Sequence, residues 1–337
     1  MGRAPDVVLA LAPVVFFLAT LSLMDSFQLV RRRSIAAAVA FGAMVALAAL
    51  AVHQWLRVTY GIPAPTVSRY IAPLTEETGK AALIAALIAM GRIAFPIEAA
   101  VLGFAVGTGF ALVENLVYLR TMPDAALMVW VVRGLGTAML QGATTAIFAM
   151  ISKALADRHA DRKAAVFVPG WLAAVAIHSA FNHRPVSPLA EALVILIVLP
   201  LLVLFVFSRS DRATREWIGA GMDLDLMLLD LVSSEQFALT RFGRYLTELR
   251  ARMPGAVVAD MFCLLRVELE LAVQAKAMLM ARDAGVTVPA DEDLDAILDE
   301  REALKRSIGT LGLLALKPLQ ITSHRDTWHR GLLGARR

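Results

Sequence analysis

The sequence offers almost no cysteine chemistry. Cys263 is the only cysteine among the 337 residues, which excludes an intrachain disulfide and a CxxC metal knuckle. The HExxH pair that many zinc peptidases carry on a helix is also missing. The net charge of +4 is small, and the basic residues of the first two thirds fall in short clusters between apolar runs. We therefore expect no nucleic-acid role.

Apolar residues make up 58% of the chain, above the roughly 45–50% of soluble domains. They are gathered into runs of about 20 residues, the length that crosses a bilayer as a helix. We therefore predict an all-α fold, a polytopic transmembrane helix bundle of about seven spans. The predicted spans lie near 7–29, 34–56, 73–91, 96–119, 130–152, 165–183 and 188–207.

The positions of lysine and arginine predict the orientation of the bundle. Clusters such as Arg31 to Arg33, and the arginines that follow residue 208, fall in alternate connections between the spans. The positive-inside rule then predicts an extracytoplasmic N-terminus and a cytoplasmic C-terminus. Beyond residue 208, apolar and charged residues alternate with a helical period. The predicted domains are therefore a transmembrane domain, 1–208, and a cytoplasmic helical domain, 209–337, whose cytoplasmic partner is unknown.

Three charged residues, Glu76, Glu77 and Lys80, lie near the start of the predicted span 73–91. An ionisable side chain in a membrane costs about 2.5–3.5 kcal/mol on insertion scales, so such residues usually face inward, form pairs and serve a function. Glu76 and Lys80 are one helical turn apart, and we expect them to face the same way. This stretch predicts a functional site inside the membrane.

Further polar residues are expected at a similar outer level of the bundle. A small-residue face at Gly103 and Gly107 should let a neighbouring helix approach the fourth span closely. His53 is instead expected at an interface or on the surface. The polar residues that the pattern gathers near the outer leaflet come from the fourth, fifth and sixth spans: Glu114, Asn115, Arg133, Gln141, His178 and Asn182.

These groups have the chemistry that peptide-bond hydrolysis needs, namely a base that activates water and donors for the oxyanion. A glutamate is the candidate base, and His178 and Asn182, one turn apart, are candidate donors. Two other functions fit the same residues. One is a non-catalytic membrane scaffold or binding protein, with Glu76 and Glu114 paired to cations. The other is transport, which is less favoured because the polar groups gather at one level.

Three motifs resemble the PrsW family of glutamic-type intramembrane proteases, which is related to the CAAX-processing and Abi membrane proteases. They are Glu76-Glu77-x-x-Lys80, Phe110-x-x-x-Glu114 and His178-x-x-x-Asn182. The resemblance implies that Glu76 and Glu77 are catalytic, that Glu114 and His178 complete the water-activating site, and that Asn182 assists the oxyanion. It also implies membrane-anchored protein substrates, such as anti-sigma factors, cut near the outer leaflet.

The resemblance leaves the cofactor open. Family members usually carry a histidine in the helix after the second motif, where this chain has Gln141. The family is also described as metalloproteases, and Glu76, Glu114 and His178 with one water are a possible zinc site. Because no HExxH supports zinc, the favoured prediction is no cofactor, with zinc as the alternative. The residues expected to support the site are Lys80, Arg133, Gln141 and Asn115.

Overall fold

The computed structural model describes residues 4–25, 29–159, 164–183, 187–286 and 293–316. Within these ranges every regular element is a helix and none is a strand, which confirms the predicted all-α fold class. The chain divides into two compact units, Met1–Ser210 and Asp211–Arg337. This division lies two residues after the boundary expected from the sequence.

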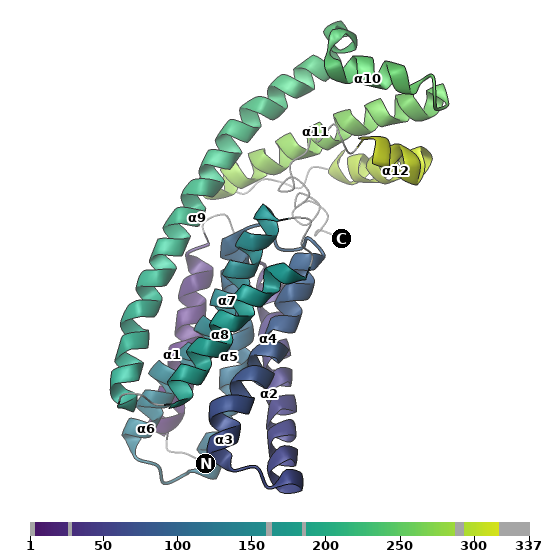
Figure 1. Ribbon diagram of the computed structural model, residues 1–337. Helices are drawn as coiled ribbons and strands as arrows, with labels where there is room; N and C mark the ends of the chain where they lie inside the picture. Colours follow the sequence, from purple (N-terminus) through teal and green to yellow (C-terminus); the bar gives the residue numbers. More distant parts are fainter. Residues whose placement is uncertain (1–3, 26–28, 160–163, 184–186, 287–292, 317–337) are drawn as a thin grey trace. The chain divides into compact units, whose positions relative to one another are not determined.

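The first unit is a bundle of helices that run side by side (Figure 1). Two short stretches in it, η1 and η2, are π-helices that lead directly into α4 and α7, while η3 is a 3₁₀ turn. The elements before α9 are α1 (Ala4–Leu23), α2 (Arg32–Tyr60), α3 (Ala64–Thr66), η1 (Val67–Ile71), α4 (Ala72–Ala89), α5 (Pro96–Thr121), α6 (Leu127–Val132), η2 (Arg133–Ala138), α7 (Met139–Arg158), η3 (Ala165–Phe167) and α8 (Val168–His183).

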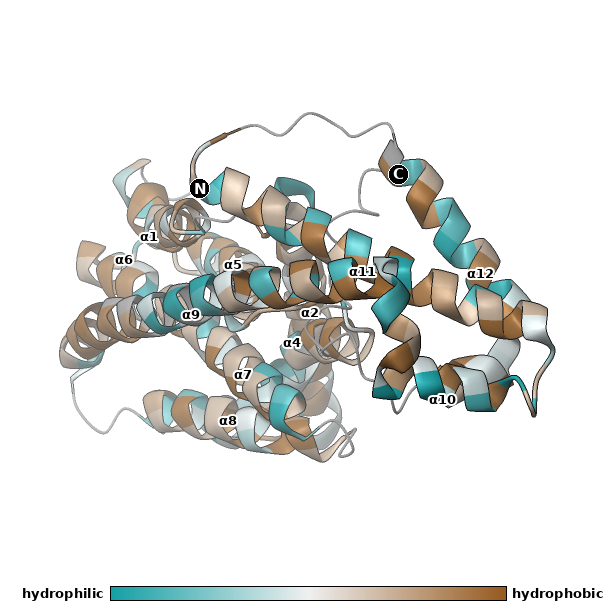
Figure 2. Ribbon diagram, turned by 90° about the horizontal axis from the view of Figure 1, so that it is seen from above, coloured by the Kyte–Doolittle hydropathy of each residue, from teal (hydrophilic) through white to brown (hydrophobic). Residues whose placement is uncertain are grey.

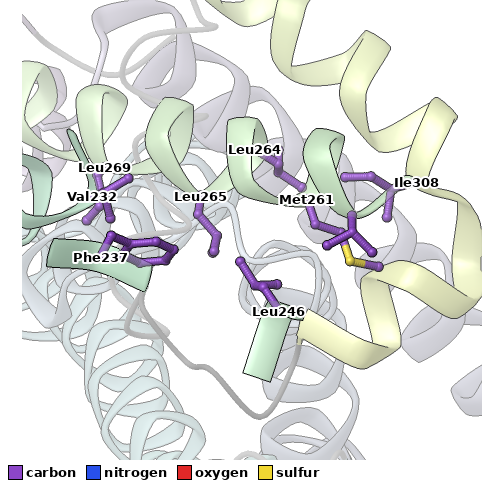
Figure 3. Packing of buried hydrophobic residues seen from close by; sticks show 9 residues of the cluster. Val232, Phe237, Leu246, Met261, Leu264, Leu265, Leu269 and Ile308 are labelled. Carbon is purple, nitrogen blue, oxygen red and sulfur yellow. The ribbon is translucent and has the colours of Figure 1, made fainter. Parts of the chain in front are cut away.

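The second unit packs its helices around a core of its own. The division between the units falls within α9 (Pro188–Ser233), which is followed by η4 (Glu235–Leu239), α10 (Arg241–Leu249), α11 (Gly255–Asp283) and α12 (Asp293–Leu316). Val232, Phe237, Leu246, Met261 and Ile308 bring all five of these elements into one buried apolar cluster (Figure 3). Hydrophilic residues alternate with apolar ones along α10 and α12 (Figure 2), as helices of a soluble domain do.

Five helical segments are long and apolar enough to cross a membrane: 4–23, 32–60, 96–121, 127–158 and 165–183. They coincide with five of the predicted spans, although residues 26–28 of the first prediction lie outside the described residues. The predicted span 73–91 falls on α4, which carries three charged residues in its 18. For the last predicted span, 188–207, the apolar part within the described residues is Pro188–Leu199, which is shorter than a membrane span. A count of seven therefore stays a prediction.

Helix α5 is the buried centre of the first unit. Most of its residues are buried, and it packs against α1, α2, α4 and α7. The predicted small-residue face is confirmed, because a Cβ atom on Gly107 would lie 2.1 Å from the carbonyl oxygen of Gln141 in α7. On another face, a Cβ on Gly109 would lie 1.9 Å from the carbonyl oxygen of Val39 in α2. The backbones of α2, α5 and α7 are in contact, which fixes the position of the polar residues they carry.

The close approach at Gly107 predicts a large effect for a small substitution. Gly107→Ala places a methyl group against backbone atoms that have no rotamer to move aside, and overpacking of this kind costs about 1–3 kcal/mol. We expect the variant to unfold at a lower temperature than the wild type when both are heated in detergent. Gly219→Ala is the matched control, since among the described residues no atom lies within 4 Å of the added Cβ. Equal midpoints for the two variants would show that α5 and α7 do not touch at Gly107.

Candidate active site

The two π-helices lie directly before α4 and α7, which carry site residues. In η1 the backbone bonds run to the fifth residue back, as from the Ala72 amide to the Val67 carbonyl. The next bond in that pattern would run from residue 73 to Ser68, but Pro73 has no N–H. The side-chain amide of Asn182 supplies the missing donor, with its Nδ2 2.8 Å from the Ser68 oxygen. Irregular helices of this kind recur at functional sites.

Glu77 is the more enclosed of the two adjacent glutamates, with 1% of its side chain exposed. Its Oε1 accepts hydrogen bonds from Lys80 Nζ at 2.6 Å and Thr144 Oγ1 at 3.1 Å, and lies 2.7 Å from His178 Nδ1. These partners come from α4, α7 and α8. A carboxylate that accepts from Nδ1 leaves Nε2 of a neutral imidazole as the unprotonated ring nitrogen. Glu77 therefore ties three helices together and orients His178.

Lys80 has no exposed surface at all, and its ammonium lies between Glu77 and Gln141. Nζ donates to Gln141 Oε1 at 2.5 Å, and it also lies 5.0 Å from the centre of the Phe110 ring. Although Glu76 and Lys80 are one turn apart, the ion pair of Lys80 forms with Glu77 at i,i+3. Both spacings are possible on a helix, and the groups on α7 and α8 select Glu77.

Glu76 has a different environment from its neighbour. Its side chain is 11% exposed, and no lysine or arginine nitrogen in the described part of the chain lies within ion-pair distance of it. His178 Nε2 lies 3.8 Å from Oε2, and His53 Nδ1 lies 3.9 Å from Oε1. Gln141 Nε2 approaches Oε2 to 3.3 Å. One carboxylate is therefore flanked by two imidazoles and an amide, without a permanent cation.

Glu114 is held by residues of two other elements. Arg133, the first residue of η2, has its Nη2 3.1 Å from Glu114 Oε1 and stacks its guanidinium 3.5 Å from the centre of the Tyr118 ring. Asn115 accepts from Arg133 Nε at 2.9 Å and donates to the Ala10 carbonyl at 2.6 Å, which connects this group to α1. On its other oxygen Glu114 receives Gln141 Nε2 at 3.3 Å.

The structure thus brings most of the predicted site residues together, but not all of them. Glu76, Glu77, Glu114 and His178, with Lys80 and Gln141, form one connected group across α4, α5, α7 and α8. Asn182 stands apart, because the contact of its amide is with the backbone of η1.

Sequence reasoning missed His53. It does not lie on the open surface, because only 13% of its side chain is exposed and its ring lies near both Thr75 and Glu76. Its Nε2 is 2.8 Å from Thr75 Oγ1. The Thr75 hydroxyl itself donates to the backbone carbonyls of Ile71 in η1 and Ala72 in α4. The signal was present in the sequence, since an ionisable residue within an apolar span is by default a functional candidate.

Comparison with known proteins agrees with this arrangement. Residues 31–207, which include every residue of the connected group, match the family model described as PrsW family intramembrane metalloprotease. The chain belongs to this family. The resemblance noted in the motifs is confirmed, and the chain is an intramembrane peptidase. No curated protein and no solved structure matches it.

The description of the PrsW family names a metal, and the donors of this chain do not fit one as they are arranged. Within the described residues, no three His, Cys, Asp or Glu side chains come together as an ion would require. Zinc holds its oxygen and nitrogen ligands at about 2.0–2.2 Å. Between Glu76 and Glu114, the two carboxylates of the expected zinc site, lies the amide nitrogen of Gln141, which has no lone pair for a metal.

The different environments of the adjacent glutamates predict different costs of the same substitution. Glu77→Gln leaves the Lys80 ammonium buried without its carboxylate, so we expect a loss of about 3–5 kcal/mol in the free energy of unfolding. Glu76→Gln should cost far less, because no ion pair with lysine or arginine is broken. Unfolding curves of the two purified variants in detergent measure the difference. A loss at Glu76 equal to that at Glu77 would contradict the assignment of the buried ion pair.

Proposed function

We propose that the chain hydrolyses a peptide bond of a membrane-anchored protein, using a water molecule activated by Glu76. The observation that carries this proposal is the contrast between the adjacent glutamates. Glu77 has its charge matched by Lys80, whereas Glu76 keeps 11% of its side chain exposed and is flanked by imidazoles. Only a carboxylate that is free to take up a proton can act as a general base, and Glu76 is that carboxylate.

In the proposed mechanism, one water lies within hydrogen-bond reach of both Glu76 Oε2 and His178 Nε2. The two atoms are 3.8 Å apart, so a single oxygen can lie about 2.8 Å from each. Glu76 takes a proton from this water while the water oxygen attacks the carbonyl carbon of the substrate. The proton then passes to the leaving nitrogen, and the products are a carboxylic acid and an amine. Glu77 keeps the ring of His178 in the orientation that this step needs.

His178 also supplies the proposed stabilisation of the oxyanion. For this role the ring carries a proton on each nitrogen before the attack begins, so that Nδ1 donates to Glu77 and Nε2 donates to the oxygen that gains charge, and His178 keeps both protons throughout the step. The oxyanion role expected of Asn182 does not enter this proposal, because its amide nitrogen is bonded to the Ser68 carbonyl at 2.8 Å. Asn182 is instead proposed to hold α8 against η1. This contact would keep Glu76 Oε2 and His178 Nε2 at their separation of 3.8 Å.

The proposed substrate is a protein anchored in the same membrane, of the anti-sigma-factor kind, cut near the outer leaflet. The motifs that resemble the PrsW family support this class of substrate. The distribution of lysine and arginine supports an extracytoplasmic N-terminus, a cytoplasmic C-terminus and a site in the outer half of the bilayer. Under this topology residues 209–337 are a cytoplasmic domain, for which we propose a binding partner in the cytoplasm.

Two alternatives each rest on a specific observation. A scaffold without activity would pair its carboxylates with cations, as Glu77 does with Lys80 and Glu114 with Arg133. Glu76 disfavours that interpretation, since it lacks such a pair in the described residues. A zinc-dependent peptidase is favoured by the description of the family as metalloproteases. It would use the same glutamates and His178, with the metal polarising the water.

The proposal predicts a selective loss of cleavage in Glu76→Gln. The glutamine keeps the size of the side chain but cannot take a proton, so hydrolysis of a reconstituted membrane-anchored substrate should slow by about 100-fold or more. A strong chelator should leave the wild-type rate unchanged. The measurement is the rate of product formation in proteoliposomes. Gly219→Ala, purified and reconstituted in the same way, is the control for losses during preparation. Loss of cleavage on chelation, with recovery on adding zinc, would favour the metal-dependent alternative instead.

A further inference from the structure

Gln141 contacts more of the site than any role so far given to it requires. It lies in α7 with 2% of its surface exposed, and its side chain reaches three charged residues on two other helices. Oε1 accepts from Lys80 Nζ at 2.5 Å. Nε2 lies 3.3 Å from Glu76 Oε2 and 3.3 Å from Glu114 Oε2. The amide therefore forms a bridge between the two carboxylates, with its oxygen turned toward the buried ammonium.

The chemistry of its neighbours fixes the orientation of this amide. An ammonium has only donors, so the atom of Gln141 that faces Lys80 has to be the oxygen. Ionised carboxylates have only acceptors, so the NH₂ group has to face Glu76 and Glu114. A flipped amide would place a donor against a donor and an acceptor against two acceptors. Lys80, which has no exposed surface, thus acts through Gln141 on residues it does not itself touch.

The Gln141 nitrogen contacts both carboxylates at once, as a bridging cation would. It lies 3.3 Å from one oxygen of each, whereas zinc would hold the same oxygens at about 2.0–2.2 Å. A metal at this point would displace the amide, which cannot serve as its ligand through nitrogen. The backbone also leaves little freedom to withdraw, since α7 is packed onto Gly107 of α5 at the level of Gln141.

We propose that Gln141 is a positioning residue that takes the place of a metal ion between Glu76 and Glu114. It holds the two carboxylates together through two N–H groups, and Lys80 supplies the positive charge from behind. This inference rests on the proposed role of Glu76, and it adds a reason why this chain acts without the metal that the family description names. The proposal also implies that a metal site can be restored in this chain. Replacing the Gln141 amide by a side chain that binds metal should let an ion bind between the carboxylates.

The first test measures bound metal directly and does not depend on activity. The wild type, Gln141→Glu and Thr145→Val are purified in detergent, incubated with zinc, dialysed and analysed for zinc per chain. The wild type and Thr145→Val should retain only traces, while Gln141→Glu should retain about one ion, because it adds a third carboxylate to Glu76 and Glu114. Zinc should also raise the unfolding midpoint of Gln141→Glu alone, by mass action on the folded state.

Thr145→Val is a matched control, since its hydroxyl bonds to the backbone oxygen of Gln141 and not to the carboxylates. If Gln141→Glu does not fold, Gln141→His offers an imidazole in the same place and the same readout. Stoichiometric zinc on the wild type would overturn the proposal. So would folded Gln141→Glu and Gln141→His variants that both fail to retain the ion.

The second test separates positioning from substrate binding. Gln141→Met keeps the length of the side chain and removes both N–H groups, so kcat should fall by about 10–100-fold, as for other residues that orient a reacting group. KM should change little, because the amide contacts the carboxylates and not the substrate. A Gln141→Met variant with the wild-type kcat would overturn the proposal. Failure of the Glu76 mechanism would instead appear as cleavage that survives Glu76→Gln, with the zinc results unaffected.

Discussion

The buried ammonium of Lys80 is the constraint on which the rest of the membrane-embedded site depends. A cation with no contact with solvent has to be matched where it lies, since an unpaired charge in an apolar interior is unstable. Glu77 matches its charge, and Gln141 gives it a second acceptor. Glu77 also takes up Nδ1 of His178, and Lys80 takes up Oε1 of Gln141. The groups of α7 and α8 left to contact Glu76 are therefore Nε2 of Gln141 and Nε2 of His178. The helices of the first unit are thus joined at the site by one charge and its acceptors, rather than by apolar packing alone.

The same constraint divides the work between two glutamates that are adjacent in the sequence. Glu77 is committed to Lys80 and to His178, so its carboxylate stabilises and orients. Glu76 points to a part of the site where its neighbours are neutral or titratable groups, and it keeps some exposure. We propose that, in an apolar surrounding, this contrast allows Glu77 to remain charged while Glu76 exchanges protons. The proposed bridge through Gln141 extends the effect of Lys80 to Glu114.

Much of this could be predicted from the sequence, and the remainder depends on contacts that no local pattern contains. The apolar runs predicted the helices, and the spacing of Gly103 and Gly107 predicted the close approach of a neighbour. The partner of Lys80 could not be predicted, because i,i+3 and i,i+4 are equally open on an isolated helix, and only α7 and α8 decide between them. The bond from Asn182 to η1 follows from the π-helix that ends shortly before Pro73, and that irregularity leaves no mark in hydrophobic periodicity.

The most direct test of this account is a double-mutant cycle on Glu77 and Lys80, measured as the free energy of unfolding in detergent. Each single change, Glu77→Gln or Lys80→Met, removes one partner and leaves the other buried without its match. The account predicts that the double variant is more stable than the sum of the single losses implies, with a coupling on the order of 2 kcal/mol or more. Single losses that add to within about 0.5 kcal/mol would contradict it, because the two side chains would then be stabilised independently of each other.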